Sequence, residues 1–324
     1  MSKFVSSLAS ALNAMLDYRE ALGLSRCTHE SSFRSFDRYC AARYPQVLSL
    51  SKEMALGWIH AELEKPRSNI QGKATAVRLL GEYLSAIGQE SYILPKNYVS
   101  QRKVFHPYIF TDAELSNLFC AMDTLPVDVL DTSAAMVAPV LFRLIYTCGL
   151  RPNEGRELRR ANIDFHTGEI LITKTKRKKE RIVVMSDDMV DLCKEYDAWR
   201  NGFAPDSDFF FSRRDGQAYT SVQLECLFKR CWESANPGIA ASLLPNIRVY
   251  DLRHRFASAI LNRWLDTGRN LYAMLPYLCA YMGHEKMSET IYYIHILPEN
   301  LIKSAGIDWS SFEGLIPEVR QWRG

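Results

Sequence analysis

The chain has 324 residues, of which 47% are hydrophobic and 24% are charged, a composition that is ordinary for a globular protein long enough to form two domains. Its net charge is only +3, which excludes a strong global field for nucleic acid, so any such affinity must come from local basic patches. The eight cysteines form no C-x-x-C pair, and neither a signal peptide nor a membrane-spanning apolar run is evident. These features predict a cytoplasmic protein with free thiols and no membrane partner.

Residues 1–98 are predicted to form a helical bundle. Amphipathic patterns with helix start and stop signals cover residues 4–22, 29–43, 51–64 and 71–87. Basic residues are interleaved with the apolar ones, and charge alone leaves open whether they meet phosphate or form a solvated face. These candidate DNA contacts are Arg34, Arg38, Lys73 and Arg78.

The composition shifts over residues 89–106, where Pro95, Asn97 and a Gln-Arg-Lys run replace the apolar periodicity, and Pro107 follows. We therefore interpret residues 99–108 as an exposed linker. Arg102 and Lys103 in this linker are further candidates for contact with DNA. The second unit, residues 109–324, opens with a capping box in which Glu114 follows Thr111 by three residues.

An apolar helix over residues 134–148 is expected at the centre of the second unit, because its apolar residues extend almost all round the helix. It ends at Gly149, and Pro152 is well placed in the first turn of the next helix. Arg151 is therefore expected to project from the corner between two helices, with Glu154 one turn away to orient it. A purely structural salt bridge between the two is the alternative interpretation.

Alternating apolar residues predict a pair of strands at residues 170–172 and 182–184, with a third strand at 162–165 and a short one at 209–211. The intervening hairpin tip is strongly basic, which suits phosphate contact, although a solvated tip is the alternative. Its candidate DNA contacts are Arg177, Lys178 and Lys179. Helices are expected over residues 186–201 and 220–234, and Lys229 and Arg230 on the second of these are candidates for the DNA groove.

The stretch from 249 to 295 carries the strongest pattern. Arg253 lies beside an apolar stripe that recurs every four residues, so it is expected in the first turn of a buried helix. Gly283 ends a second apolar helix, and His284 follows it. Tyr293 comes nine residues after that histidine, on a short helix with Ser288 as its expected N-cap. Each feature alone has an ordinary structural explanation.

Taken in order, the segments L-R-H-x-F-A, G-H and T-x-x-Y-x-H resemble the tyrosine recombinase (phage integrase) family, including the XerC and XerD type. The segment G-L-R-x-x-E around Arg151 is similar to the first box of that family. The resemblance implies a mainly α fold with a small antiparallel sheet (α+β). In it, an N-terminal helical bundle, the SAM-like core-binding domain, clamps the duplex opposite a recombinase catalytic domain.

The resemblance also implies the chemistry. Tyr293 would attack the scissile phosphorus and hold a 3′ phosphate, while Arg151 and Arg253 clamp the non-bridging oxygens and His284 donates a further hydrogen bond. A hairpin lysine would protonate the leaving 5′ oxygen. Counting back from K-E-R-x-V places that role at Lys176, with Lys174 as the second candidate. No metal or cofactor is required, because side chains neutralise the phosphate.

One position departs from the family, which usually has a histidine three residues before the second arginine, where this chain has Tyr250. A phenol, with an ordinary pKa near ~10, is a poor base at neutral pH, and Asp251, His254 or Lys174 are candidates to compensate. The longer segment between the boxes resembles transposon-encoded members. We therefore expect DNA integration or excision for a mobile element.

The expected assembly is a homotetramer on paired double-stranded DNA sites, and a monomer or dimer off DNA, with sister recombinases as further candidate partners. Two alternatives remain open on the sequence. One is an accessory DNA-binding subunit with an impaired site, and the other is a type IB topoisomerase-like activity.

Overall fold

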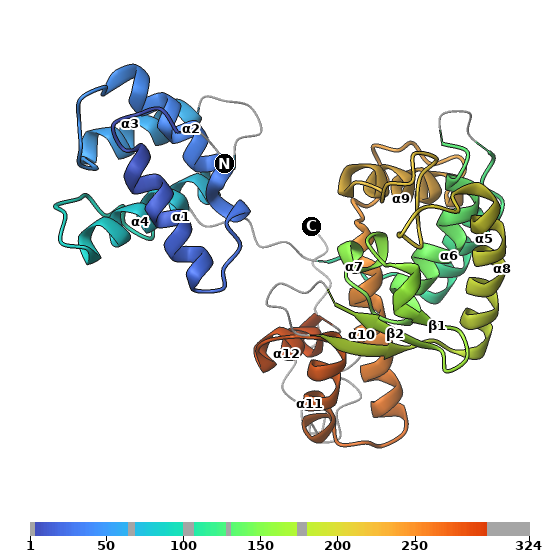
Figure 1. Cartoon of the computed structure of the whole chain (residues 1–324). Coiled ribbons are helices and arrows are strands. Elements are labelled where there is room, and N and C mark those ends of the chain that lie inside the picture. Colours follow the sequence, from blue (N-terminus) through green and yellow to red (C-terminus); the bar gives the residue numbers. More distant parts are fainter. Residues whose placement is uncertain (1–3, 64–68, 100–106, 128–130, 174–179, 297–324) are drawn as a thin grey trace, which may run out of the picture. The chain divides into compact units, whose positions relative to one another are not determined.

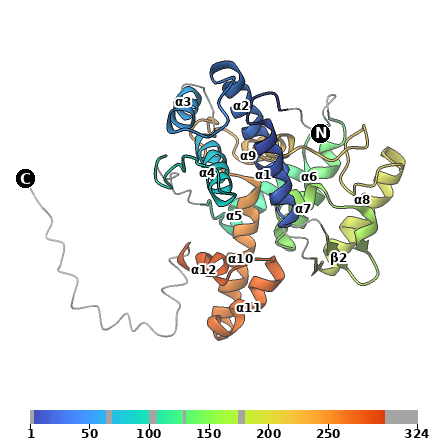
Figure 2. The same cartoon turned by 60° about the vertical axis from the view of Figure 1, so that its left-hand side comes forward.

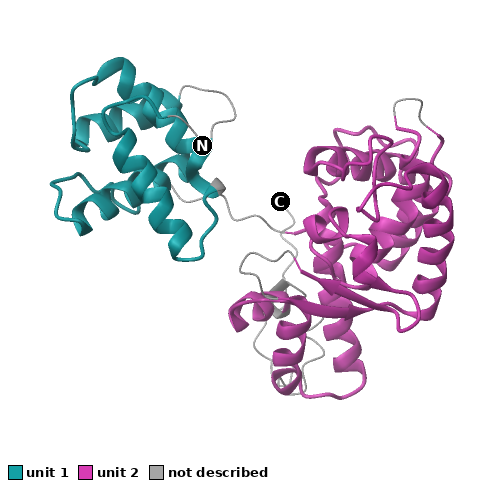
Figure 3. Ribbon diagram, viewed as in Figure 1, with its two compact units in different colours: residues 1–105 teal, residues 106–324 magenta. Residues whose placement is uncertain are grey.

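The computed structural model describes residues 4–63, 69–99, 107–127, 131–173 and 180–296. The chain divides into two compact units, residues 1–105 and 106–324, which Figure 3 shows in different colours. Most of the expected linker, including Arg102 and Lys103, lies outside the described residues. None of the described helices is both long and apolar enough to cross a membrane.

The first unit contains four helices, α1 (Ala9–Ala21), α2 (Cys27–Arg43), α3 (Lys52–Leu63) and α4 (Ile70–Ala86). Asn69 caps α4 by accepting a hydrogen bond from the Gly72 amide. The core of this unit is aromatic at its centre, where Phe36 and Trp58 meet edge to face with their ring centroids 5.1 Å apart. These four amphipathic helices bury their apolar faces against one another, as their periodicity predicts.

The second unit is mostly helical. Its elements in chain order are α5 (Asp112–Asp123), α6 (Ala134–Thr147), α7 (Pro152–Arg156), the 3₁₀ turn η1 (Arg160–Asn162), β1 (Ile163–Asp164), β2 (Glu169–Ile172), β3 (Arg181–Val184), α8 (Asp187–Phe203), α9 (Ser221–Ala235), α10 (Val249–Asp266), α11 (Leu271–Met282) and α12 (Met287–Ile296). The expected capping box at Thr111 is present, and Thr220 with Gln223 forms a second one at α9. The mainly α fold class with a small antiparallel sheet is confirmed.

The sheet has the order β1-β2-β3, with both pairs antiparallel. Ile170 faces Val183 across the central pair, and both side chains are buried, whereas Leu171 and Ile182 on the opposite face are exposed. This one-sided burial fixes the register of β3, because a slip of one residue would expose Val183 to solvent.

The strand predicted at residues 209–211 is wrong. Phe209 makes only an isolated bridge to Arg159, and no strand is assigned to this segment. Phe210 and Phe211 are both fully buried and pack against Tyr196, so consecutive side chains enter the core instead of alternating between two faces.

Two apolar clusters support the second unit. The larger one includes eight buried residues of α6, a helix that contains Pro139 and keeps Met136 and Thr147 exposed. The smaller one joins α10, α11 and α12 and includes Phe256, Met282 and Tyr293. Figures 1 and 2 show α11 and α12 gathered at one end of α10, beside the sheet. The segment that carries Arg151, in the first third of this unit, therefore lies close to the segments that carry Arg253, His284 and Tyr293, in its last third.

Candidate active site

The corner between α6 and α7 positions Arg151. Gly149 has φ +59°, and a Cβ added there would come within 2.5 Å of the Phe256 ring, so only glycine fits this turn. Pro152 then begins α7 with Arg151 at its N-cap. The chain reverses tightly, and the Arg151 side chain leaves the corner towards the end of α11.

Glu154 binds several guanidinium groups at once. Its two carboxylate oxygens accept from Nη1 and Nη2 of Arg181 at 2.9 and 2.7 Å, and Oε1 also accepts from Arg151 Nη1 at 2.8 Å. Arg253 Nη1 lies 3.9 Å from Glu154 Oε2. Burial acts to raise the pKa of Glu154, but the hydrogen bonds and charges of these arginines hold it at about 2.

The same three arginines bind the C-terminus of α11. Arg181 Nε donates to the Tyr281 carbonyl at 2.9 Å, Arg253 Nη2 to Met282 at 2.6 Å, and Arg151 Nη2 to Gly283 at 2.6 Å. The last carbonyls of a helix have no partner within it and carry its negative dipole end. Three cations therefore cap three successive carbonyls and fix the turn before His284.

Arg253 is fully buried, although it carries a charge. Its Nη1 donates to the Gly149 carbonyl at 2.6 Å, which ties α10 to the corner that holds Arg151. Burial lowers the pKa of Arg253. Three guanidinium groups against the single Glu154 carboxylate leave an excess of two positive charges among these four groups, which favours an anion at this site.

His284 bridges Arg253 and Thr290. Its Nε2 lies 3.1 Å from Arg253 Nη2, and its Nδ1 lies 2.8 Å from Thr290 Oγ1. A guanidinium only donates, so Nε2 accepts and Nδ1 carries the proton. Burial, followed by the charge of Arg253, lowers the pKa of His284 to about 3, so the ring is neutral at pH 7.

Tyr293 is 2% exposed, whereas its neighbour Tyr292 is 39% exposed. The Tyr293 ring stacks on His284, with centroids 5.8 Å apart and the planes inclined by 16°. Burial raises the pKa of Tyr293 to about 12, and the charge of Arg253 acts against that rise. Ser288 lies inside α12, which begins at Met287, so the predicted N-cap is wrong by at least two residues.

Tyr250 and His254 lie on the same side of α10 as the Tyr293 ring. The His254 ring centroid is 5.0 Å from that of Tyr250 and 5.4 Å from that of Tyr293. Burial, followed by the charges of Arg248 and Arg253, lowers the pKa of His254 to about 4. Tyr250 interacts electrostatically with Arg151 and Arg253, so its phenol belongs to the same group of side chains.

Comparison with known proteins follows this geometry. The model of the phage integrase family matches residues 109–300, more than half of the chain. The chain belongs to that family. It is therefore a tyrosine-type site-specific DNA recombinase.

Three similar proteins span nearly the whole recombinase. The integrase/recombinase-like protein y4rE of Sinorhizobium fredii is 29% identical over 301 residues, which cover 91% of this chain and 93% of y4rE. The XerH site-specific recombinase bound to difH DNA has a TM-score of 0.62 at 20% identity, covering 94% and 85% of the two chains. The Tn1549 transposon integrase in complex with transposon right-end DNA has a TM-score of 0.62 at 16% identity, covering 87% and 94%.

The structure brings most of the predicted site residues of this recombinase into one cluster. That cluster, called the tyrosine site below, consists of the predicted residues Arg151, Glu154, Tyr250, Arg253, His254, His284 and Tyr293, together with Arg181 and Thr290. The basic hairpin tip, with Lys174, Lys176, Arg177, Lys178 and Lys179, lies outside the described residues.

The candidate DNA contacts of the first unit are partly engaged with protein groups. Arg34 pairs with Glu30 at 2.9 Å, and Lys73 forms an ion pair with the buried carboxylate of Glu62. Arg38 Nε donates to the Arg34 carbonyl at 3.3 Å, and Arg78 donates to Thr75 at 3.1 Å. On α9, Lys229 is exposed and Arg230 is half-buried.

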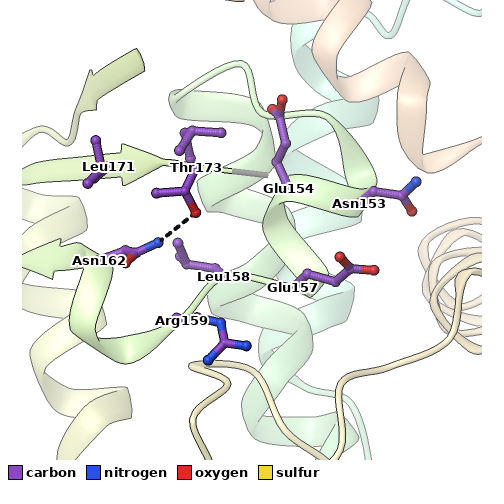
Figure 4. A pocket seen from close by; sticks show the side chains of 9 residues that line it. Asn153, Glu154, Glu157, Leu158, Arg159, Asn162, Leu171 and Thr173 are labelled. Carbon is purple, nitrogen blue, oxygen red and sulfur yellow. Dashed lines mark hydrogen bonds between the residues drawn. The ribbon is translucent and has the colours of Figure 1, made fainter. Parts of the chain in front are cut away.

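A shallow recess lies beside the tyrosine site, between α7, η1 and β2 (Figure 4). Asn162 and Thr173 face each other in it across a 3.5 Å hydrogen bond. Glu154 lines this recess, but the remaining lining residues come from neither α10 nor α12. The recess therefore shares Glu154 with the tyrosine site and none of the side chains of α10 or α12.

Two residues of the site were missed by sequence reasoning, Arg181 and Thr290. Strand parity was the available signal for Arg181, because it lies two residues before the buried Val183 and so points to the same face of β3. Thr290 is fully buried one turn before Tyr293, but its contact with His284 joins α12 to the loop that follows α11 and has no local signature.

Proposed function

We propose that this recombinase cuts and rejoins DNA strands through a covalent 3′-phosphotyrosine intermediate on Tyr293. The observation that carries the proposal is the Tyr293 ring stacked on His284 and interacting with the Arg253 guanidinium, with Arg151 held on the same carboxylate as Arg253. A tyrosine hydroxyl next to an excess of two positive charges matches the needs of attack on a phosphodiester.

The Arg151 and Arg253 guanidinium groups act on the negative charge that develops in the transition state. When the tyrosine oxygen forms its bond to phosphorus, charge gathers on the non-bridging oxygens, and the bond to the 5′ oxygen breaks. Arg151 and Arg253 present fixed forks to those oxygens, and neither loses its charge at neutral pH. Release of a free 5′ hydroxyl keeps the bond energy in the phosphotyrosine, so a second strand end can reverse the step.

Two proton transfers complete the step. The proton of Tyr293 goes to a neighbouring acceptor, for which the neutral His254 ring and the Tyr250 hydroxyl are the candidates in the tyrosine site. The leaving 5′ oxygen takes a proton from the hairpin, where Lys176 is the first candidate and Lys174 the second. A substrate with sulfur at that oxygen leaves without a proton, and it assigns the role to the lysine whose alanine variant it rescues.

We further propose that the first unit and the catalytic unit clamp duplex DNA, that four copies assemble on paired sites, and that the reaction moves a mobile element. The y4rE, XerH and Tn1549 proteins support this, because they are named as an integrase or recombinase and two of them are complexes with DNA. The proposed contacts among the described residues are the basic side chains of Arg34, Arg38, Lys73, Arg78, Lys229 and Arg230.

The test is a covalent trap. The full chain is incubated with a library of nicked duplexes that carry random sequence on both sides of the nick, so that cleavage near the nick releases a short fragment and leaves the adduct. We expect an SDS-resistant adduct that Tyr293→Phe abolishes and Tyr292→Phe retains, since only Tyr293 contacts His284 and Arg253. Mass spectrometry of the digested adduct identifies the modified tyrosine.

Sequencing of the trapped duplexes then defines the target site. A chain that binds duplexes selectively but never forms the adduct is the accessory subunit, and the proposed chemistry is then wrong. An adduct that is lost with Tyr292→Phe and kept with Tyr293→Phe moves the nucleophile by one residue.

A further inference from the structure

Arg181 lies within the tyrosine site, and its donors are directed at protein groups. It begins β3, its side chain is 9% exposed, and it shares a strand face with the buried Val183. Both of its Nη atoms bind Glu154, and its Nε binds the Tyr281 carbonyl. Arg151 and Arg253 also act on Tyr293 through their charge, whereas Arg181 acts through the groups it holds.

Glu154 is the group through which Arg181 acts. The carboxylate is 5% exposed and must be paired, because an unpaired buried charge is costly. Arg181 binds both oxygens at 2.9 and 2.7 Å, and the Arg151 backbone amide binds Oε2 at 2.8 Å. The Arg151 side chain therefore binds only Oε1, through Nη1, and Arg253 stays 3.9 Å away. Without Arg181, the carboxylate would draw the forks of Arg151 and Arg253 onto itself.

From this geometry we propose that Arg181 is a positioning residue of the tyrosine site: by satisfying Glu154, it keeps the Arg151 guanidinium oriented towards the scissile phosphate. This inference rests on the proposed function and deepens it. The contact with Tyr281 extends the same role to the end of α11, where Gly283 lies over the Arg181 side chain, with its ideal Cβ position 3.1 Å from Arg181 Cδ.

The experiment is a double-mutant cycle on the rate of adduct formation, with the full chain saturating the nicked duplex. Arg181→Ala should slow trapping roughly 10²-fold, the loss expected when a catalytic group is displaced by about 1 Å, and DNA affinity should be unchanged. In an Arg151→Ala background, the same substitution should cause no further loss, because its target is already gone. Arg181→Lys, which keeps the charge but lacks the fork, should give an intermediate rate.

The matched control is Arg143→Ala, which removes another fork-to-carboxylate pair in the same unit, with both bonds to Asp123 at 2.6 Å. It should leave the trapping rate unchanged while lowering stability. If Arg181→Ala slows the Arg151→Ala chain by the same factor as it slows wild type, the proposal is wrong.

A second readout does not depend on cleavage. The Arg151 Nε–H resonance, identified by its loss in Arg151→Ala, should show faster and wider motion in Arg181→Ala than in wild type or Arg143→Ala. An equally ordered Arg151 in all three chains would overturn the proposal. A wild-type chain that forms no adduct overturns the proposed function instead, and the resonance still decides whether Arg181 positions Arg151.

Discussion

Arg151 and Arg253 each use the separate arms of a guanidinium for different partners. Arg253 reaches the Gly149 and Met282 carbonyls with different Nη atoms, and Arg151 reaches Glu154 and Gly283 in the same way. An ammonium is a compact point charge and cannot bridge such partners while it also holds a phosphate. The clamp therefore depends on the shape of the side chain as well as its charge.

We predict that Arg151→Lys and Arg253→Lys each lose about 3 kcal/mol of transition-state stabilisation, the cost of removing one pre-organised donor. This corresponds to a fall of roughly 10²-fold in the single-turnover trapping rate. Arg143→Lys serves as the control, because Arg143 pairs with Asp123. A lysine variant at either clamp position that cleaves at the wild-type rate would contradict the role of the fork.

His284 should make stability depend on pH. Its pKa is lowered to about 3 in the folded chain and is near ~6.5 when unfolded, so below pH 6.5 the unfolded chain binds more protons. The stabilisation that the neutral His284 ring contributes to the folded chain is fully present above pH 6.5 and is lost as the pH falls towards 3. Between pH 7 and 5 we expect a loss of at most ~2 kcal/mol in the free energy of unfolding, reduced by solvent screening.

The measurement is urea unfolding at pH 7 and pH 5 for the wild type and for His284→Gln, which cannot titrate. The wild type should lose more stability than the variant over this interval. Equal losses would mean that His284 keeps an ordinary pKa in the folded chain.

At the scale of elements, the C-terminus of α11 joins three segments of the chain. Arginines from the α6–α7 corner, from β3 and from α10 each bind one of its last carbonyls. Gly283 makes this possible, because its φ of +64° turns the chain at the helix end and its lack of a side chain leaves room for Arg181.

We predict that Gly283→Ala destabilises the chain by ~1 kcal/mol more than Gly268→Ala, since overpacking adds to the backbone strain. Both glycines follow a helix with positive φ, but a Cβ at Gly268 meets nothing within 4 Å, whereas one at Gly283 lies 3.1 Å from Arg181 Cδ. Urea unfolding of the two variants isolates the Arg181 contact. Equal losses would show that Arg181 moves aside at little cost.

For the whole molecule, each unit buries an apolar cluster of its own. Residues 106–324 should therefore fold alone and keep the tyrosine site. We predict that deletion of residues 1–105 weakens DNA binding by orders of magnitude, because one of the two units proposed to enclose the duplex is removed. Trapping on Tyr293 should remain detectable at high DNA concentration.

Affinity of the full chain should also fall steeply with salt, as counterions released from many phosphates return, and the deleted chain should show a shallower slope. Electrophoretic mobility shifts at several salt concentrations measure both effects. A fragment that binds the trapped site as tightly as the full chain, with the same slope, would recast the first unit as an interaction module.

The sequence by itself determined what depends on neighbouring residues. The capping box at Thr111, the glycine stop at Gly149 and Pro152 at the first turn of α7 are local signals within one helical turn, and each appears in the structure where it was expected. The order of the motifs indicated the family, and the family implied which arginines, histidine and tyrosine belong together.

The tertiary structure alone decided how those groups are held. Arg181 and Glu154 are 27 residues apart, and Arg151 and Gly283 are 132 apart, so their pairing depends on how β3 and α11 pack against the α6–α7 corner. The same holds for Phe210 and Phe211, which the core buries together although their pattern predicts a strand. Periodicity reports which side of an element is buried, whereas the partner that a buried charge finds is set by the packing of segments far apart in the chain.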